Sequence, residues 1–326
     1  MGILLYLVPR EVLAESILHL TTIIFFLIPF VIGGRQLSGI LLFNSILFSL
    51  SLVFFSFHVS KKFGKLTGFL SGLIIMLLPF FVFSARNPGN GFTPTAFFLF
   101  FMTIAYFYDV NKFGLVKMLL FGFLFGLILS MLFAYVIVLI PVLIFVFLLL
   151  KRKERFLVFL AGLIFAFAPL VLFELKNNFV MLKNTFIDKS YLSFVENTNL
   201  PNGVKLNKNI FTNSLDLINK MRSYFGINIY LVILFLVSSF AWLKKYKERS
   251  LVFVTGISFV ILAFLLRFQY SGHYLLPFLT LTAFCTLVII SRSKLKILLL
   301  MLSITFLAIT FPKKIIMRKP KEIIHW

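Results

Sequence analysis

The sequence is poor in acidic residues and in cysteine, and both shortages limit what the chain can be. Ten Asp and Glu stand against 32 Lys and Arg, a formal net charge of +22. The single cysteine, Cys285, lies in an apolar run and cannot form an internal disulfide. With four scattered histidines it offers no zinc-site spacing, so we predict a small buried apolar residue there and no metal site. The first 16 residues also lack the basic region and cleavage site of a secretory signal peptide.

Charge is also missing from the middle of every long apolar run. The chain is 61% hydrophobic with a mean hydropathy of +1.06, whereas soluble domains are about 45–50% apolar. A soluble core cannot bury this much apolar surface, but lipid can cover it. The cations lie in short clusters between the apolar runs, which is typical of membrane-protein loops and argues against a nucleic-acid partner.

The apolar runs predict an all-α polytopic membrane protein with about ten transmembrane helices. A separate run, 118–150, begins after Lys117 and ends before the cations of 151–155. We predict a hairpin of two short or broken helices there, 118–131 and 134–150, with Pro141 distorting the second. The other predicted spans are 38–60, 66–84, 92–108, 156–174, 227–243, 250–267, 273–291 and 297–312.

The distribution of lysine and arginine among the short loops predicts the orientation in the membrane. One set of loops holds 16 of these cations, whereas the opposite short loops, 85–91 and 268–272, hold one, Arg86. We therefore expect the first set to be cytoplasmic. Its members are 61–65, 109–117, 151–155, 244–249 and 292–296.

This orientation places the long polar segment 175–226 outside the cytoplasm, where we expect an interfacial helix. The segment 17–33 either spans the membrane or lies along its outer interface. Residues 1–312 then form one transmembrane domain, and 313–326 form a basic tail. The number of predicted spans puts that tail outside the cytoplasm. Its five lysines and arginines conflict mildly with this, because such cations are usually retained on the cytoplasmic side.

Polar and ionisable residues collect at the predicted external helix ends, which indicates a site at the outer membrane–water boundary. Ion-coupled transporters usually need ionisable groups near the membrane midplane. The predicted spans contain no such groups at mid-span, which argues against that class. The external group comprises Arg86, Asn87, Asn90, Glu174, Lys176, Asn177, Arg267, Tyr270, His273 and Tyr274.

Several segments, in order, resemble GT-C-type membrane glycosyltransferases, the protein-mannosyltransferase-like and lipid-A-sugar-transferase-like enzymes. The stretch 35–101, with its KKFGK turn and its SARNPGN loop, looks like the second to fourth helices of that family. The FAPLVLFELKNNF boundary (167–179) and SGHYLLPFLTL (271–281) match further features, as do FGFLFGLILS (121–130) and the Pro-bearing helix ending in KRKER. The resemblance covers about residues 16–295.

The resemblance implies a transferase that takes a sugar from a polyprenyl-phosphate carrier to a lipid, glycan or protein acceptor. Its site would face outward from a membrane such as the bacterial cytoplasmic membrane, within the cell envelope. Because the carrier phosphate stores the donor energy, no nucleotide-binding loop is needed, and a divalent metal stays open as a cofactor. The substrate-binding residues would be Arg86, Asn87, Glu174, Lys176, Arg267, His273 and Tyr274.

The sequence departs from the family at its catalytic loop. Family members carry an Asp in the first external loop, after a first helix, and residues 19–34 look like the tail of that loop. The nearest carboxylates are Glu11 and Glu15, which become the candidate bases. The chain is accordingly either an N-terminally shortened sequence or a degenerate member of the family.

Two alternative functions remain open from the sequence. A transporter or flippase of a lipid-linked saccharide would show intramembrane polar groups or internal repeats, and a non-catalytic homologue would lack an external carboxylate. The site residues also have plain structural interpretations. Arg86 would snorkel to lipid headgroups, Glu174 would be a solvated charge at a helix end, and His273 would form a hydrogen bond at a helix start.

Overall fold

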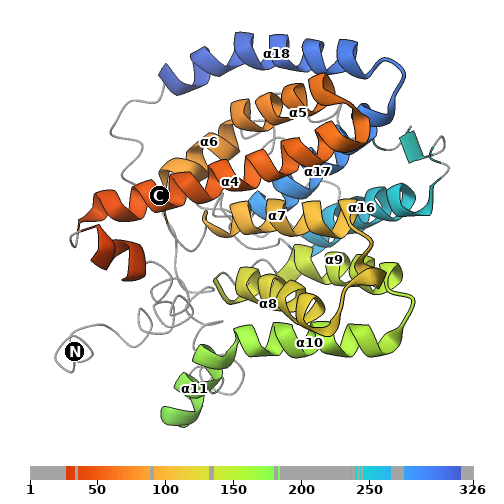
Figure 1. Ribbon diagram of the computed structural model, residues 1–326. Coiled ribbons are helices and arrows are strands. Elements are labelled where there is room, and N and C mark those ends of the chain that lie inside the picture. The colour runs from red at the N-terminus through yellow and green to blue at the C-terminus, as the bar shows by residue number, and fades with distance from the viewer. Residues whose placement is uncertain are drawn as a thin grey trace.

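The protein is a bundle of helices, most of which run side by side between two ends (Figure 1). The computed structural model describes residues 27–33, 36–88, 92–131, 136–179, 183, 236, 239–240, 243, 245–265 and 275–316. Within these ranges the regular structure is helical and contains no strand. The predicted all-α class is confirmed.

The helices coincide with the apolar runs, because a run of this composition satisfies its own backbone groups as a helix. The described elements are α4 (Leu37–Phe63), α5 (Lys65–Leu77), α6 (Pro79–Arg86), α7 (Pro94–Phe107), the 3-10 turn η1 (Val110–Lys112), α8 (Leu115–Met131), α9 (Val136–Leu149), α10 (Lys153–Ala166), α11 (Ala168–Lys176), α16 (Tyr246–Leu265), α17 (Leu276–Arg292) and α18 (Lys296–Ile316).

Two predicted spans are broken, which corrects the prediction of single helices there. The run 66–84 forms α5 and α6, which are bent by 66° around Leu78. Pro79 opens α6 and holds the preceding residue in an extended conformation, so the helix cannot continue through it. The run 156–174 likewise divides into α10 and α11 at Phe167, two residues before Pro169.

Other boundaries agree with the sequence or move by about one turn. The predicted division of 118–150 into two helices is confirmed as α8 and α9, with Pro141 inside α9, whereas their pairing as a hairpin stays a prediction. Helix α18 continues to Ile316, beyond the predicted limit at 312. The predicted span 227–243 and the interfacial helix of 175–226 fall almost entirely outside the described residues, as does most of 17–33.

The core lies around α7 and α17, which are buried along most of their length. Cys285 of α17 is fully buried, as predicted for a small apolar residue. Helices α8 and α10 approach closely, because Gly122 and Gly126 of α8 face backbone oxygens of α10, and Gly162 of α10 faces the Leu119 oxygen. A methyl group at Gly122 or Gly162 would collide with backbone.

Fewer of the described helices than predicted are both long and apolar enough to cross a membrane unaided. Among the described residues, one helix, Ser38–Phe63, passes a test of length and apolar composition. The bent pair α5–α6 passes it if counted as one span, and shorter apolar stretches of 10–17 residues lie in α7, α8, α9, α17 and α18. The structure thus establishes a helical bundle, and a polytopic topology of about ten spans stays a prediction.

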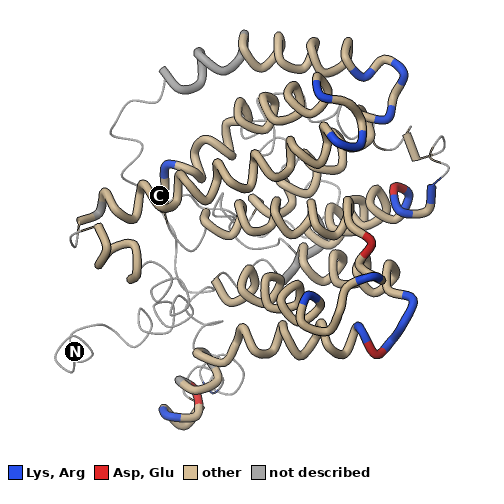
Figure 2. The backbone as a smooth tube through the Cα atoms, viewed as in Figure 1, with Lys and Arg blue, Asp and Glu red and all other residues tan. Residues whose placement is uncertain are grey.

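Most of the charged residues that the structure describes gather at one end of the bundle (Figure 2). The connections at that end include Gly64, the segment 108–114, the turn 150–152 and the turn 293–295. They overlap the loops that the sequence grouped on one side, so the cation-rich connections do share one end. We refer to it as the cationic end.

Candidate functional site

Helix α6 carries the predicted site residues Arg86 and Asn87 out of the bundle at the end opposite the cationic end. Its last carbonyls have no intrahelical partners, and Asn44 of α4 supplies donors to them. The fully buried Asn44 Nδ2 donates to the carbonyl oxygens of Ser84 (3.1 Å) and Ala85 (2.9 Å). Thr93 Oγ1 in turn donates to Asn44 Oδ1 at 2.9 Å. This network fixes the point where α6 ends.

Arg86 and Asn87 differ in their surroundings. Arg86 is the last residue of α6 and is exposed. Asn87 follows it and is half-buried, and its Nδ2 donates to the Phe83 carbonyl oxygen at 2.7 Å. The Asn87 amide therefore closes its own helix, whereas the Arg86 side chain extends from a braced helix end toward the surroundings.

Glu174 lies on α11 and is 6% exposed, which corrects the alternative of a solvated charge at a helix end. Helix α11 ends just after it, because Asn178 and Phe179 adopt positive φ angles and the Phe179 N–H donates to the Glu174 carbonyl oxygen at 2.8 Å. Lys176, two residues on, is exposed. Because residues two apart lie on different faces of a helix, the buried Glu174 and the exposed Lys176 point away from each other.

The predicted external site is described only in part. The end of α6 and helix α11 lie well apart from each other (Figure 1). Glu11, Glu15, Arg267, His273 and Tyr274 fall outside the described residues, so their geometry relative to Arg86 and Glu174 stays a prediction. Within the described residues, no cluster of three or more His, Cys, Asp or Glu side chains is suited to a metal ion.

An open groove of about 620 Å³ lies between α4 and α5, away from the predicted site residues. Large apolar side chains form most of its wall, including Phe57, Phe69 and Met76. Ser56 and Ser60 of α4 face Gly72 and Gly68 of α5 where the two helices approach. The groove therefore offers an apolar surface and little polar chemistry.

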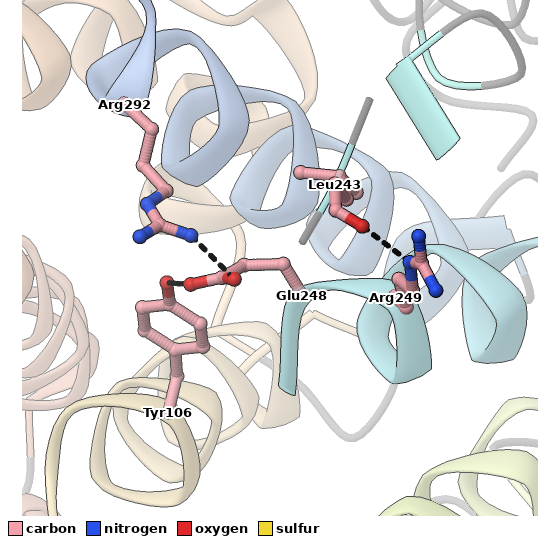
Figure 3. Close-up of polar contacts among 5 residues, drawn as sticks. All are labelled: Tyr106, Leu243, Glu248, Arg249 and Arg292. Carbon is pink, nitrogen blue, oxygen red and sulfur yellow. Dashed lines mark hydrogen bonds and ion pairs between the residues drawn. The ribbon is translucent and has the colours of Figure 1, made fainter. Parts of the chain in front are cut away.

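A buried polar network at the cationic end was not predicted from the sequence (Figure 3). Glu248 of α16 is 2% exposed, and its Oε1 accepts a hydrogen bond from the Tyr106 hydroxyl at 2.8 Å. Arg292 Nη1 of α17 lies 2.5 Å from Glu248 Oε2. The network joins α7, α16 and α17, and it supplies both a donor and a counter-charge to a carboxylate that burial would otherwise destabilise.

Two lysines stand around the same tyrosine. Lys62 Nζ of α4 lies 4.2 Å from the Tyr106 ring centroid, and Lys247 Nζ of α16 lies 5.5 Å from it. Lys247 Nζ also donates to the Tyr108 carbonyl oxygen at 3.2 Å. Burial, reinforced by the nearby charge of Lys62, lowers the pKa of Lys247 to about 8. We refer to Lys62, Lys247 and Arg292 as the cation cluster.

The sequence predicted 244–249 as a solvated loop, and this is why the network was missed. Helix α16 begins at Tyr246, before the predicted start of the span at 250, so Glu248 lies on a helix that faces the bundle. The available signal was an acidic residue within a run of four cations at the start of an apolar helix. Its partners are far away in sequence, since Tyr106 and Glu248 are 142 positions apart.

Comparison with known proteins adds no relative. No protein-family model matches the chain, and the searches of curated proteins and of solved structures found no match.

Proposed function

We propose that the protein is embedded in a membrane by most of its helices. The bundle exposes large apolar side chains along its outer helices. In the most apolar 18-residue segment of α4, only 22% of the residues are buried. Val53 and Phe57 of α4 are 63% and 60% exposed, and Phe165 of α10 is 65% exposed. Contiguous apolar surface of this kind favours a lipid environment over water.

The packing of α8 on α10 supports the same proposal. Gly122 and Gly126 are four residues apart and let the two backbones approach closely. Small residues at this spacing are typical of helix interfaces in membranes, where close packing rather than the hydrophobic effect drives association. The cationic end would then face the cytoplasm, where loops are rich in lysine and arginine.

We further propose that the opposite end is the site of a GT-C-type glycosyl transfer from a polyprenyl-phosphate sugar. The observation that carries this proposal is the exposed Arg86 at the end of α6, a helix end that Asn44 braces. A guanidinium suits bidentate recognition of a phosphate, and a braced helix end holds it in one place. The resemblance of residues 35–101 and 167–179 to that family supports the same assignment.

The proposed reaction needs a base as well as a phosphate ligand. The acceptor hydroxyl oxygen would attack the anomeric carbon of the sugar, and the carbon–oxygen bond to the carrier phosphate would break, with the phosphate leaving as the anion. A carboxylate would take the proton of the acceptor hydroxyl. Glu11 and Glu15 are the candidates for that base. Glu174 and Lys176 lie on α11, apart from the end of α6, so we do not assign the acceptor to them.

The test is a transfer assay with the full chain reconstituted in vesicles. Radiolabelled polyprenyl-phosphate hexoses and pentoses serve as donors, and lipid-linked and free glycans serve as acceptors. We expect transfer by the unmodified protein and a loss on the order of 100-fold in Arg86→Ala, because the phosphate loses its charged donor. Arg152→Ala is the control, since Arg152 is also exposed but precedes α10 at the cationic end.

Two results would count against the proposal. Absence of transfer with every donor would leave a non-catalytic membrane protein as the better interpretation. Equal losses in Arg86→Ala and Arg152→Ala would show that the loss does not arise from a phosphate contact at α6.

A further inference from the structure

The cationic end holds more positive charge near Tyr106 than its buried carboxylate can balance. Glu248 faces Arg292 at 2.5 Å, and Lys62 and Lys247 stand beside the ring whose hydroxyl binds that same carboxylate. Within the described residues neither lysine forms an ion pair. Three cations from three helices therefore converge on one buried carboxylate, and Asp109 is a second acidic side chain close enough to act on Lys247.

The cluster is accessible from outside the bundle. Lys62 is exposed at the end of α4, Lys247 is half-buried, and the Arg292 side chain is 27% exposed. A guanidinium has five N–H donors, and the ion pair to Glu248 is made by Nη1. An anion arriving at this end would thus meet two ammonium groups and a guanidinium edge.

Exposed tyrosines beside the cluster indicate what surrounds it. Tyr246, next to Lys247, is 59% exposed, and Tyr108, whose carbonyl oxygen accepts from Lys247, is 41% exposed. Tyrosines at helix ends concentrate at the level of lipid headgroups, where the ring meets apolar chains and the hydroxyl meets water. Phe57, less than two turns before Lys62 on α4, is 60% exposed and marks the adjoining apolar surface.

We propose that Lys62, Lys247 and Arg292 bind the phosphate of an anionic lipid headgroup at the cationic end. The inference rests on the proposed membrane embedding, but it concerns the end opposite the proposed transferase site. Basic recesses between helices on the cytoplasmic side are suited to anionic headgroups, and each lysine contributes to the attraction. The bound phosphate would also offset the repulsion between Lys62 and Lys247.

The experiment uses the full chain, purified in detergent and stripped of lipid, and titrated with mixed micelles. One arm contains phosphatidylglycerol, a second contains phosphatidylcholine, and a third contains inorganic phosphate without lipid. Bound phospholipid is counted by native mass spectrometry. The test variant is Lys62→Gln with Lys247→Gln, and the control is Lys61→Gln with Lys294→Gln. The control removes the same charge from exposed positions at the same end.

We expect selective retention of phosphatidylglycerol, weakened on the order of 30-fold in the test variant and little changed in the control. The proposal is overturned if both double variants lose affinity equally, since general surface charge would then explain binding. It is also overturned if phosphatidylcholine binds as well, or if inorganic phosphate alone competes fully for the site. The variants' circular dichroism and size-exclusion profiles verify that both remain folded.

The two proposals fail in distinguishable ways. If the protein were extracted from cells without detergent, the proposed membrane embedding would be wrong, and both proposals would fail with it. Retention of phosphatidylglycerol without any sugar transfer would leave this inference standing and remove the transferase. Sugar transfer without lipid selectivity would do the reverse.

Discussion

The surroundings of individual charged side chains separate two kinds of residue in this protein. Glu248 is buried and has two partners, whereas Arg86 is exposed at a helix end. Burying an unpaired carboxylate is costly, so the Glu248 contacts to Tyr106 and Arg292 are needed for the fold around them. Arg86 has no comparable structural duty at an exposed position, which leaves it suited to ligand recognition.

Replacing Glu248 by Gln should destabilise the bundle at the cationic end. The amide cannot neutralise Arg292, although the partial exposure of Arg292 limits the penalty. We expect a loss of about 2 kcal/mol, seen as a lower midpoint of unfolding in detergent. Tyr106→Phe is the comparison, because it removes one hydrogen bond and should cost about 1 kcal/mol. A larger effect of Tyr106→Phe than of Glu248→Gln would contradict the importance of the charge pair.

At the scale of helices, two features shape the bundle: proline breaks and glycine contacts. Pro79 and Pro169 come at or just after the breaks within α5–α6 and α10–α11. The first break directs α6 so that its last carbonyl groups meet the Asn44 side chain of α4. It therefore determines the position of Arg86 at the end of α6. The glycines of α8 and α10 act differently, because they determine how near two helices come.

The closeness of α8 and α10 predicts an asymmetric response to glycine substitution. Gly122→Ala would place a methyl group against the Phe159 carbonyl oxygen, and backbone cannot move aside cheaply. We expect a loss of about 1–3 kcal/mol, measured as thermal stability in detergent. Gly256→Ala in α16 is the control, since a methyl group there meets nothing within 4 Å and alanine favours the helix. Equal destabilisation by both substitutions would show that the close packing is not the cause.

For the molecule as a whole, the separation of charge between the two ends is the main property. Most of the described cations share one end, while Arg86 and α11 lie at the other (Figures 1 and 2). In a membrane this polarity predicts one orientation, with the cationic end retained in the cytoplasm.

Cysteine labelling in intact cells tests that orientation. The native Cys285 is fully buried, so it should give a low background. With a membrane-impermeant maleimide, Arg86→Cys should be labelled in intact cells and Lys153→Cys only after permeabilisation. The reverse pattern would invert the topology, and labelling of both positions in intact cells would argue against a membrane between them.

Local properties were determined by the sequence alone. Because a long apolar run satisfies its backbone groups within itself, the runs 38–60, 92–108 and 118–150 predict their helices without reference to the rest of the chain. Cys285 was predictable as a small buried apolar residue, because a lone cysteine within such a run behaves as one. The grouping of cation-rich loops at one end also follows from helix order.

Only the tertiary structure decided which distant residues meet. Glu248 looked solvated within its cationic run, and its burial depends on Tyr106 and Arg292, which neighbouring helices bring to it. Asn44 likewise meets the end of α6 from 40 residues away. The bend at Pro79 changes the direction of the chain by an amount that depends on the helices packed around it. Partnerships of this kind arise from packing between elements, and no local pattern encodes them.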